Sequence, residues 1–288
     1  MKYKFMKDNI HKFYLNSMSE VLKVSRSGYY AWINRPMSAR QKYNTYLTER
    51  IRSIHEQRKR VYGCLRITAE LKYEGFSCSK NRIARLMRKQ GITARTKRRF
   101  RITTNSNHKL PVANNLVEMQ FNPQKKNSLW TTDITYIRTS EGWLYLSVIL
   151  DLWSRAIISW KADRSMDENL VIKTLGKALK DRKPTDELIL HSDRGSQYAS
   201  LRLRNMLRDN NIKQSMSSKG NCYDNAPTES FFSTLKRELV YRERFKTREE
   251  AKQKLFEYIE VFYNRQRRHS SLGYLSPMQF ENLKITPN

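Results

Sequence analysis

The sequence predicts an α/β domain, a mixed sheet flanked by helices, that follows an all-α region. From residue 130 onward, short segments rich in β-branched and aromatic residues alternate with helical patterns. Before residue 130, the readable patterns are helical, with apolar residues recurring every three to four positions. The 288 residues, which include 16 Tyr, 11 Phe and 5 Trp, can bury more than one core, so separate modules are expected.

Residues 1–44 form an N-terminal helical segment with two short helices expected over residues 18–33. Ser25 or Ser27 provides an N-cap for the second helix, and Pro36 closes it. Two interpretations stay open for this segment. It is either a helix-turn-helix or a helix pair that packs into a core without touching DNA.

Residues 45–101 read as three further helices. The first is expected over Asn44–Arg60 and the second over Leu65–Tyr73, after the helix-breaking Gly63. Ser79, a good N-cap residue, begins the third, and Gly91 ends it. The third helix has an apolar face of Ile83, Leu86 and Met87, and a separate basic face of Arg82, Arg85 and Lys89.

Positive charge is concentrated in this helical region. The whole chain has a formal net charge of +29. Residues 50–110 hold 18 basic and 3 acidic residues, a net charge of +15, whereas residues 127–240 have a net charge of only +3. A generically basic surface would spread the charge evenly. The uneven distribution favours a basic helix-turn-helix over 45–101 that binds DNA, with its last helix in the major groove, over a merely solvated basic face.

A basic run over Thr93–Arg101 follows the third helix and includes Lys97, Arg98 and Arg99. It is predicted either to lie along DNA phosphates or to serve as a flexible charged spacer, and the sequence favours neither. Residues 102–119 are expected to be a linker to the catalytic region over residues 120–285.

The α/β region follows the order βββαβαβα and ends in a helical tail. Strands are expected over residues 130–138, 143–151, 155–162, 187–193 and 212–216. Helices are expected over residues 170–179, 198–209, 226–240 and 247–264, followed by a final turn at Pro277. Pro227 falls in the first turn of the 226–240 helix, where its missing N–H does no harm. A mixed sheet with helices on its faces accounts for this order.

Three acidic residues occupy chemically costly positions. Asp133 lies inside the first strand, Asp193 ends an apolar strand, and Glu229 lies near the start of the 226–240 helix. A carboxylate in apolar surroundings is costly unless it is paired or bound to a metal. Oxygen ligands converging at one sheet edge suit Mg²⁺, and two such ions can catalyse phosphoryl transfer. Lys236, two helical turns after Glu229, is placed to hold a phosphate beside the metals.

The sequence segments around these acids resemble those of a known family. Residues 130–137 (WTTDITYI), 191–198 (HSDRGSQY) and 224–236 (DNAPTESFFSTLK) resemble the three signature blocks of a DDE integrase core, and 35 residues separate Asp193 from Glu229, as is typical there. Upstream, residues 62–67 and 85–92 resemble the helix-turn-helix that precedes such cores. Residues 24–32 resemble the N-terminus of the proteins of this family. The chain is similar over nearly its whole length to second-frame (OrfB) DDE transposases of the IS-three insertion-sequence family.

This resemblance implies a ribonuclease-H-like integrase core that uses Mg²⁺ or Mn²⁺, as two ions, for DNA strand cleavage and strand transfer. It implies that Asp133, Asp193 and Glu229 are metal ligands and that Lys236 is the basic residue beyond them. It also implies element ends and target DNA as partners, a homo-oligomer on DNA, and the first-frame (OrfA) protein or a frameshift fusion with it.

Other features narrow the class of protein. Five His and three Cys lack zinc-ligand spacing, so no zinc is expected. His191 is interpreted as a packing residue that orients the Asp193 loop, and His269 as a possible phosphate contact. The lack of a long apolar run or a signal sequence, and the three scattered cysteines, predict a reduced, cytoplasmic protein without a membrane partner. The resemblance implies that the protein is bacterial and associated with the nucleoid.

Two functions compete with transposition. The first is a sequence-specific DNA-binding regulator with an inactive core, which the intact set of three acids disfavours. The second is a ribonuclease acting on RNA–DNA hybrids, which leaves the basic helical region without a role.

Overall fold

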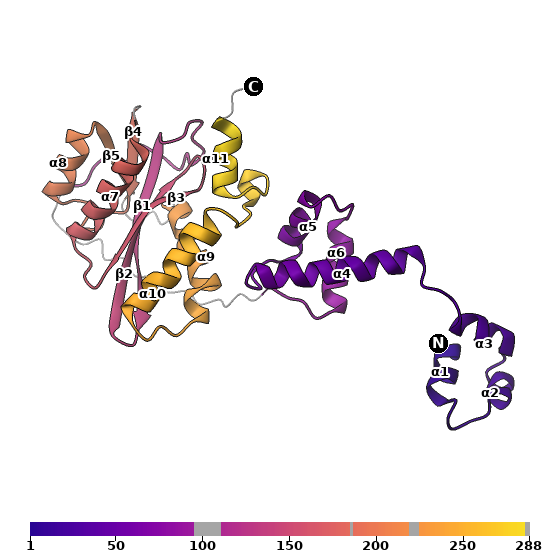
Figure 1. Cartoon of the computed structure of the whole chain (residues 1–288). Helices are drawn as coiled ribbons and strands as arrows, with labels where there is room; N and C mark the ends of the chain where they lie inside the picture. The colour runs from indigo at the N-terminus through magenta and orange to yellow at the C-terminus, as the bar shows by residue number, and fades with distance from the viewer. Residues whose placement is uncertain (95–110, 185–186, 219–224, 286–288) are drawn as a thin grey trace. The chain divides into compact units, whose positions relative to one another are not determined.

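The computed structural model describes residues 1–94, 111–184, 187–218 and 225–285, and these form two compact units (Figure 1). The first unit is Met1–Thr93 and the second is Ala94–Asn288. None of the described helices is both long and apolar enough to cross a membrane.

The first unit begins with three short helices, α1 (Lys2–Asn9), α2 (Leu15–Val21) and α3 (Arg26–Ile33). Their small core consists of Met6, Met18 and Tyr29. Ser25, one of the two predicted caps, accepts a hydrogen bond from the Gly28 N–H at 3.1 Å. Helix α1 was not predicted from the sequence. Met6 is its single buried residue, and one apolar residue cannot show the helical spacing of an apolar face.

The next three helices are α4 (Ala39–Gln57), α5 (Cys64–Tyr73) and α6 (Lys80–Lys89). Their buried contacts come from the predicted apolar residues, among them Leu47, Ile51, Ile54, Ile67, Leu71 and Ile83. Helix α4 begins five residues before the predicted Asn44. Its start is a capping box, in which the Gln41 N–H donates to Ser38 Oγ and the Ser38 N–H donates to Gln41 Oε1.

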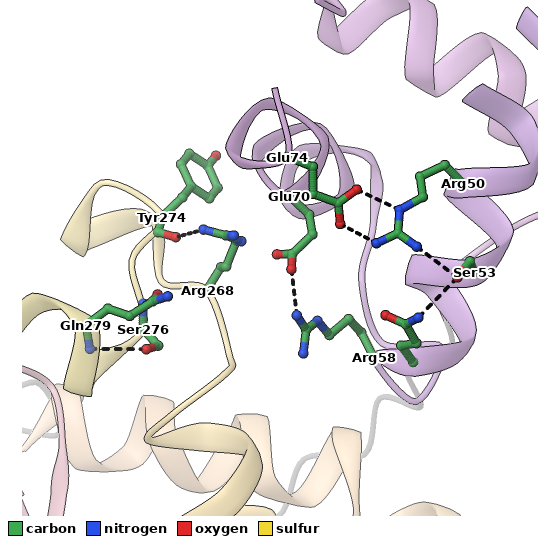
Figure 2. Close-up of polar contacts among 10 residues, drawn as sticks. Arg50, Ser53, Arg58, Glu70, Glu74, Arg268, Tyr274, Ser276 and Gln279 are labelled. Atoms are coloured by element: carbon green, nitrogen blue, oxygen red, sulfur yellow. Dashed lines mark hydrogen bonds and ion pairs between the residues drawn. The ribbon is translucent and has the colours of Figure 1, made fainter. Parts of the chain in front are cut away.

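Ion pairs join α4 to α5 (Figure 2). Arg50 donates two parallel hydrogen bonds to Glu74, both 2.6 Å long, and Arg58 donates to Glu70 at 2.6 Å. Bidentate Arg–carboxylate pairs fix orientation as well as distance. They therefore set the angle at which α5 presents α6.

The second unit is built on a five-stranded mixed sheet with the order β3-β2-β1-β4-β5. Its strands are β1 (Leu129–Thr139), β2 (Gly142–Asp151), β3 (Ile157–Asp163), β4 (Leu188–Ser192) and β5 (Ile212–Met216). The first three are antiparallel, and β4 runs parallel to β1 and β5. With the intervening helices α7 (Glu168–Arg182) and α8 (Leu201–Asp209), this confirms the predicted order of elements.

The two faces of the sheet are covered by different helices (Figure 1). Trp130 belongs to the main core, which includes Leu175 of α7 and Leu203 of α8. The next residue, Thr131, bonds to Thr228 of α9 (Ala226–Glu238). Because successive strand residues point to opposite faces, α9 covers the face opposite α7 and α8.

The tail departs from the single helix expected over 247–264. Helix α10 (Arg248–Phe256) continues as a π-helix, η2 (Glu257–Tyr263). In this wider helix, Glu260 accepts from the Trp160 Nε1–H, and the Asn264 amide bonds both the N–H and the C=O of Ile157. These contacts with β3 are tertiary, which is why apolar periodicity did not reveal them.

Three short elements complete the tail of the chain. They are the 3₁₀-helices η1 (Val240–Arg242) and η3 (Ser270–Leu272), and α11 (Pro277–Ile285). At the turn before α11, Arg268 donates to the Tyr274 carbonyl and Ser276 caps the helix through the Gln279 N–H (Figure 2). Helix α11 is fixed to α7 by the bidentate pair of Arg182 with Glu281, 2.8 Å in both bonds.

Asp151, fully buried at the end of β2, should make the second unit less stable as the pH rises. Burial raises the pKa of its carboxyl to about 6, against the opposing N–H donors of Trp153 and Asn127. The unfolded chain, with an ordinary Asp pKa, binds fewer protons between pH 4 and 6. The contribution of Asp151 to stability is therefore fully present below about pH 4, and about 3 kcal/mol is lost as the pH rises from about 4 through 6.

Denaturant unfolding at pH 4, 5, 6 and 7 tests this. An Asp151→Asn variant should show a flatter stability slope over this range than the wild type, whatever its absolute stability. Equal slopes for the two proteins would contradict the assignment.

Candidate active site

The register of two parallel strands brings the two predicted aspartates together. Strand β4 pairs with β1 only as far as Thr131, which lies opposite His191. Asp133 lies two residues beyond Thr131, and Asp193 lies two residues beyond His191. The pairing ends there, so Asp133 and Asp193 lie just beyond the last paired residues, close enough for the charge of Asp193 to raise the pKa of Asp133.

Asp133 is partly buried and lies in strongly unfavourable surroundings for a negative charge. Burial raises its pKa well above the ordinary value, Asp193 raises it further, and Glu229 adds to the effect. The Ile134 N–H, which donates to Asp133 Oδ1 at 2.7 Å, and the ammonium of Lys236 act in the opposite direction. The acids thus destabilise one another's ionised forms, and a bound cation would relieve this.

The loop that carries Asp193 is tightly held. The Gly195 N–H donates to Asp193 Oδ1 at 2.9 Å. Arg194 Nε donates to the Ser217 carbonyl at 2.6 Å, and the Ser217 N–H donates to the Ser192 carbonyl at 2.9 Å. The end of β5 therefore fixes the position of the Asp193 carboxylate.

His191 is fully buried in β4, two residues before Asp193. Its Nδ1 lies 2.9 Å from Ser215 Oγ, and its Nε2 lies 3.4 Å from Ser217 Oγ. Both serines belong to β5 or follow it directly, so His191 links the strands behind the Asp193 loop. His269 lies in the tail, partly buried, with its ring edge-on to Tyr263 and its Nε2 3.4 Å from Arg267 Nη1.

Glu229 is presented by the first turn of α9. The Thr228 hydroxyl donates to Thr131 Oγ1 at 2.7 Å, and both side chains are fully buried. This bond fixes the start of α9 to β1, two residues before Asp133. Glu229 is itself more exposed than the aspartates, and burial followed by Asp193 raises its pKa.

The donor set fits a hard divalent cation. Within the described residues, no three or more acidic, His or Cys side chains are already gathered closely enough to hold a metal. The carboxylates nevertheless act on one another electrostatically, and next to them the buried Asn225 Oδ1 has no hydrogen-bond partner among the residues that the structure describes. Its amide nitrogen is 3.5 Å from the Thr132 carbonyl, one residue before Asp133. Oxygen donors of this kind are what Mg²⁺ and Mn²⁺ prefer.

Lys236 lies close to the acids and is held by an aromatic ring. Its Nζ is 5.1 Å from the centre of the Tyr136 ring, which packs edge-on against Trp143. Burial lowers the pKa of Lys236, while Asp133 raises it. The cation therefore remains beside Asp133 without closing on it as an ion pair.

Sequence reasoning missed three residues of this site: Tyr198, Asn225 and Thr228. The buried Tyr198 hydroxyl is 3.4 Å from Thr132 Oγ1, and burial, Asp133 and Asp193 raise its pKa. All three lie inside the blocks that surround Asp193 and Glu229, which was the available signal. Their roles depend on contacts with β1 that no local pattern displays.

The residues predicted to contact DNA are only partly described. Arg82, Arg85 and Lys89 lie on α6 as expected. Lys97, Arg98 and Arg99 lie outside the described residues.

Gly195→Ala should impair the site without unfolding the protein. A Cβ at this position would lie 3.1 Å from Asp193 Oδ1 and 2.9 Å from Gln197 Oε1. Gln197 can move aside, whereas the Asp193 carboxylate must shift. Since small displacements of a reacting group are costly, strand cleavage should fall roughly tenfold or more. Cleavage assays and thermal melts check this, with Gly176→Ala on α7, where the nearest atom is 3.5 Å away, as the control.

Comparison with known proteins shows the family to which the chain belongs. Residues 123–222 and 229–285 each match an integrase core domain family, and residues 42–100 match an HTH-like domain family. The chain is 43% identical to the transposase InsF for insertion sequence IS3A of Escherichia coli K12 over 287 residues, 99% of this chain and all of the relative. The chain belongs to the IS3 transposase family.

Two further similarities are found. A 31 kDa insertion element IS600 protein of Shigella sonnei is 45% identical over 91% of this chain and 97% of its own length. A simian T-cell lymphotropic virus intasome chain aligns with a TM-score of 0.48 and 14% identity over 82% of this chain and 74% of its own.

Membership of the IS3 family confirms the predicted class. The transposase has an integrase core of the ribonuclease-H-like type, preceded by a helical HTH-like region. It is an enzyme of the polynucleotidyl transferase class that acts in DNA transposition.

Proposed function

We propose that this transposase cuts DNA at the ends of its insertion sequence and joins the freed ends to target DNA, with Asp133, Asp193 and Glu229 holding two Mg²⁺ or Mn²⁺ ions. The observation that carries the proposal is the parallel pairing of β1 with β4, because Asp133 and Asp193 each follow its last paired residues, Thr131 and His191, by two positions. Glu229 is carried by a different element, α9, whose start is hydrogen-bonded to β1.

Both chemical steps are in-line displacements at phosphorus. In the first, a water oxygen attacks an end phosphodiester, its proton is lost to solvent, and the broken P–O bond leaves a free 3′-OH. In the second, that 3′ oxygen attacks a target phosphodiester and displaces a target 3′-OH. When bound, the ions activate the nucleophile and neutralise charge on the leaving oxygen. No covalent bond between protein and DNA is needed.

The chain's own residues prepare the site for these steps. The Gly195 N–H and the Ser217 contacts hold the Asp193 carboxylate in place, and the Thr131–Thr228 bond holds α9. Lys236 supplies a positive charge beside Asp133 for a DNA phosphate. Because burial raises the pKa of Asp133, protons compete with the cation, and metal loading should improve as the pH rises.

Further partners follow from the family resemblance. We expect the terminal inverted repeats and target duplex as substrates, an oligomer assembled on DNA, and cooperation with a first-frame protein or a frameshift fusion. The expected place of action is the nucleoid of a bacterial cytoplasm.

A strand-transfer assay tests the proposal. The full chain is incubated with a labelled duplex ending in the element's terminal repeat, a target plasmid, and Mg²⁺ or EDTA. Mg²⁺-dependent nicking at the repeat boundary and joined products are expected. Binding without nicking would instead favour the DNA-binding regulator, and cleavage restricted to RNA–DNA hybrids would favour the ribonuclease.

A further inference from the structure

A cavity of about 530 Å³ lies where the beginnings of α4 and α6 meet, outside the active site. It is lined by Arg40, Tyr43, Ser79, Asn81, Arg82 and Arg85. Three of these six residues are arginines and none is acidic. The first turn of α6, capped by Ser79, adds the positive end of a helix dipole.

Arg82 is fixed in this cavity by two side chains of α4. Its Nε donates to Asn44 Oδ1 at 3.0 Å, and its guanidinium carbon lies 4.7 Å from the centre of the Tyr43 ring. Tyr43 is itself held by a bond from its hydroxyl to the Ser77 carbonyl at 3.1 Å. Since Nε is used, the two terminal nitrogens of Arg82 remain as a fork for a ligand.

The nearby acids do not neutralise this charge. Residues 39–93 contain four acidic residues, and three of them, Glu56, Glu70 and Glu74, pair with arginines of α4 or of its C-terminal end. Within the described residues, neither Arg40 nor Arg85 makes a hydrogen bond or an ion pair. The cavity therefore holds an uncompensated cluster of guanidinium groups, one of them already oriented.

We propose that this cavity binds a single phosphate of the DNA backbone, with Arg82 as a rigid bidentate donor and with Arg40 and Arg85 closing around it. The inference rests on the proposed function, because it takes element DNA as the ligand. It assigns Arg82 to positioning the duplex rather than to reading bases. Residues further along α6, such as Lys89, remain free for the groove.

Binding to DNA can be measured apart from cleavage by fluorescence anisotropy without metal. Two duplexes of equal length are compared, one carrying the terminal repeat and one unrelated, at 50 to 200 mM salt. Arg40→Ala and Arg82→Ala should each weaken binding to both duplexes about tenfold at 50 mM salt. The slope of log affinity against log salt should become shallower by about 1, so the defect shrinks roughly fourfold across this range.

Two further variants separate geometry from charge. Arg82→Lys keeps the charge but loses the fork, so it should keep the wild-type salt slope and still bind more weakly. Lys72→Ala removes one exposed positive charge from α5, outside the cavity, and should behave as the wild type. Because Arg40 has no hydrogen bond or ion pair to lose in the described part of the chain, its variant remains informative if Arg82→Ala alters the fold in a thermal melt.

Three results would overturn the assignment. The first is an unchanged affinity and an unchanged salt slope in both alanine variants. The second is a loss of affinity confined to the terminal-repeat duplex, which would indicate base reading. The third is an equal loss of affinity in Lys72→Ala. Any of these could occur while the wild type still cleaves and joins DNA, so the cavity can fail as a phosphate site while transposition stands. A wild type that binds but never cleaves would refute the proposed function and leave the cavity assignment intact.

Discussion

Asp133→Asn should abolish Mg²⁺-dependent strand cleavage and strand transfer while leaving DNA binding intact. The amide keeps the size of the side chain but removes a negative oxygen ligand near Asp193. Metal ions stabilise the charge of the transition state by several kcal/mol, and a loss of about 4 kcal/mol lowers the rate about 10³-fold. Rates of nicking on a terminal-repeat duplex and anisotropy on the same duplex measure the two effects.

The control is Asp209→Asn, at the exposed C-terminal end of α8, where the carboxylate pairs only with its neighbour Arg208. It makes the same chemical change on the same unit and should keep wild-type rates. Cleavage by Asp133→Asn within a few-fold of the wild type would refute the assignment of Asp133 as a metal ligand. A loss of DNA binding equal to the loss of cleavage would point to a misfolded chain instead.

Arg267→Ala should destabilise the second unit by about 3–5 kcal/mol, because it leaves Glu238 buried without its partner. Both side chains are about 5% exposed. Arg267 donates two bonds to Glu238, of 2.9 and 2.8 Å, and the Tyr258 hydroxyl donates a third of 2.8 Å. Burial alone would lower the pKa of Arg267, yet Glu238 raises it above the ordinary value.

A drop of roughly 10 °C in melting temperature is expected for a unit of this size. Replacing both partners by apolar residues, Glu238→Leu with Arg267→Met, should recover much of the loss, since no buried charge then lacks a partner. Arg237→Ala, one residue away on α9 and partly exposed, is the control and should cost under 1 kcal/mol. If the double variant is as unstable as the sum of the singles, the pair is not coupled as described.

This ion pair also bears on the proposed site, because Glu238 ends α9, the helix whose first turn carries Glu229. The predicted acids were visible in the sequence as carboxylates inside a strand, at a strand end and near a helix start, and the family resemblance grouped them. The residues that set the helix in place, Thr228 at one end and Glu238 at the other, were not visible. They act through Thr131 and Arg267, which are 97 and 29 residues away along the chain.

The helices, too, include features that were predictable from the sequence and features that were not. Ser79 as a cap and the two faces of α6 were predicted correctly, because caps and helical periodicity depend on residues a few positions apart. The start of α4 and the π-helical tail were predicted wrongly. At α4 a local capping box was overlooked, and in the tail the helix type is set by contacts with β3.

The sequence by itself determined the order of strands and helices, the basic first unit and the identity of the acids, since each depends on local periodicity, composition or short motifs. Only the tertiary structure decided that Asp133 and Asp193 lie near each other, because the pairing of β1 with β4 is a long-range register that a one-residue slip would undo. It also decided that Arg82 is held by Tyr43 and Asn44, since packing between helices and not helical spacing brings those side chains together.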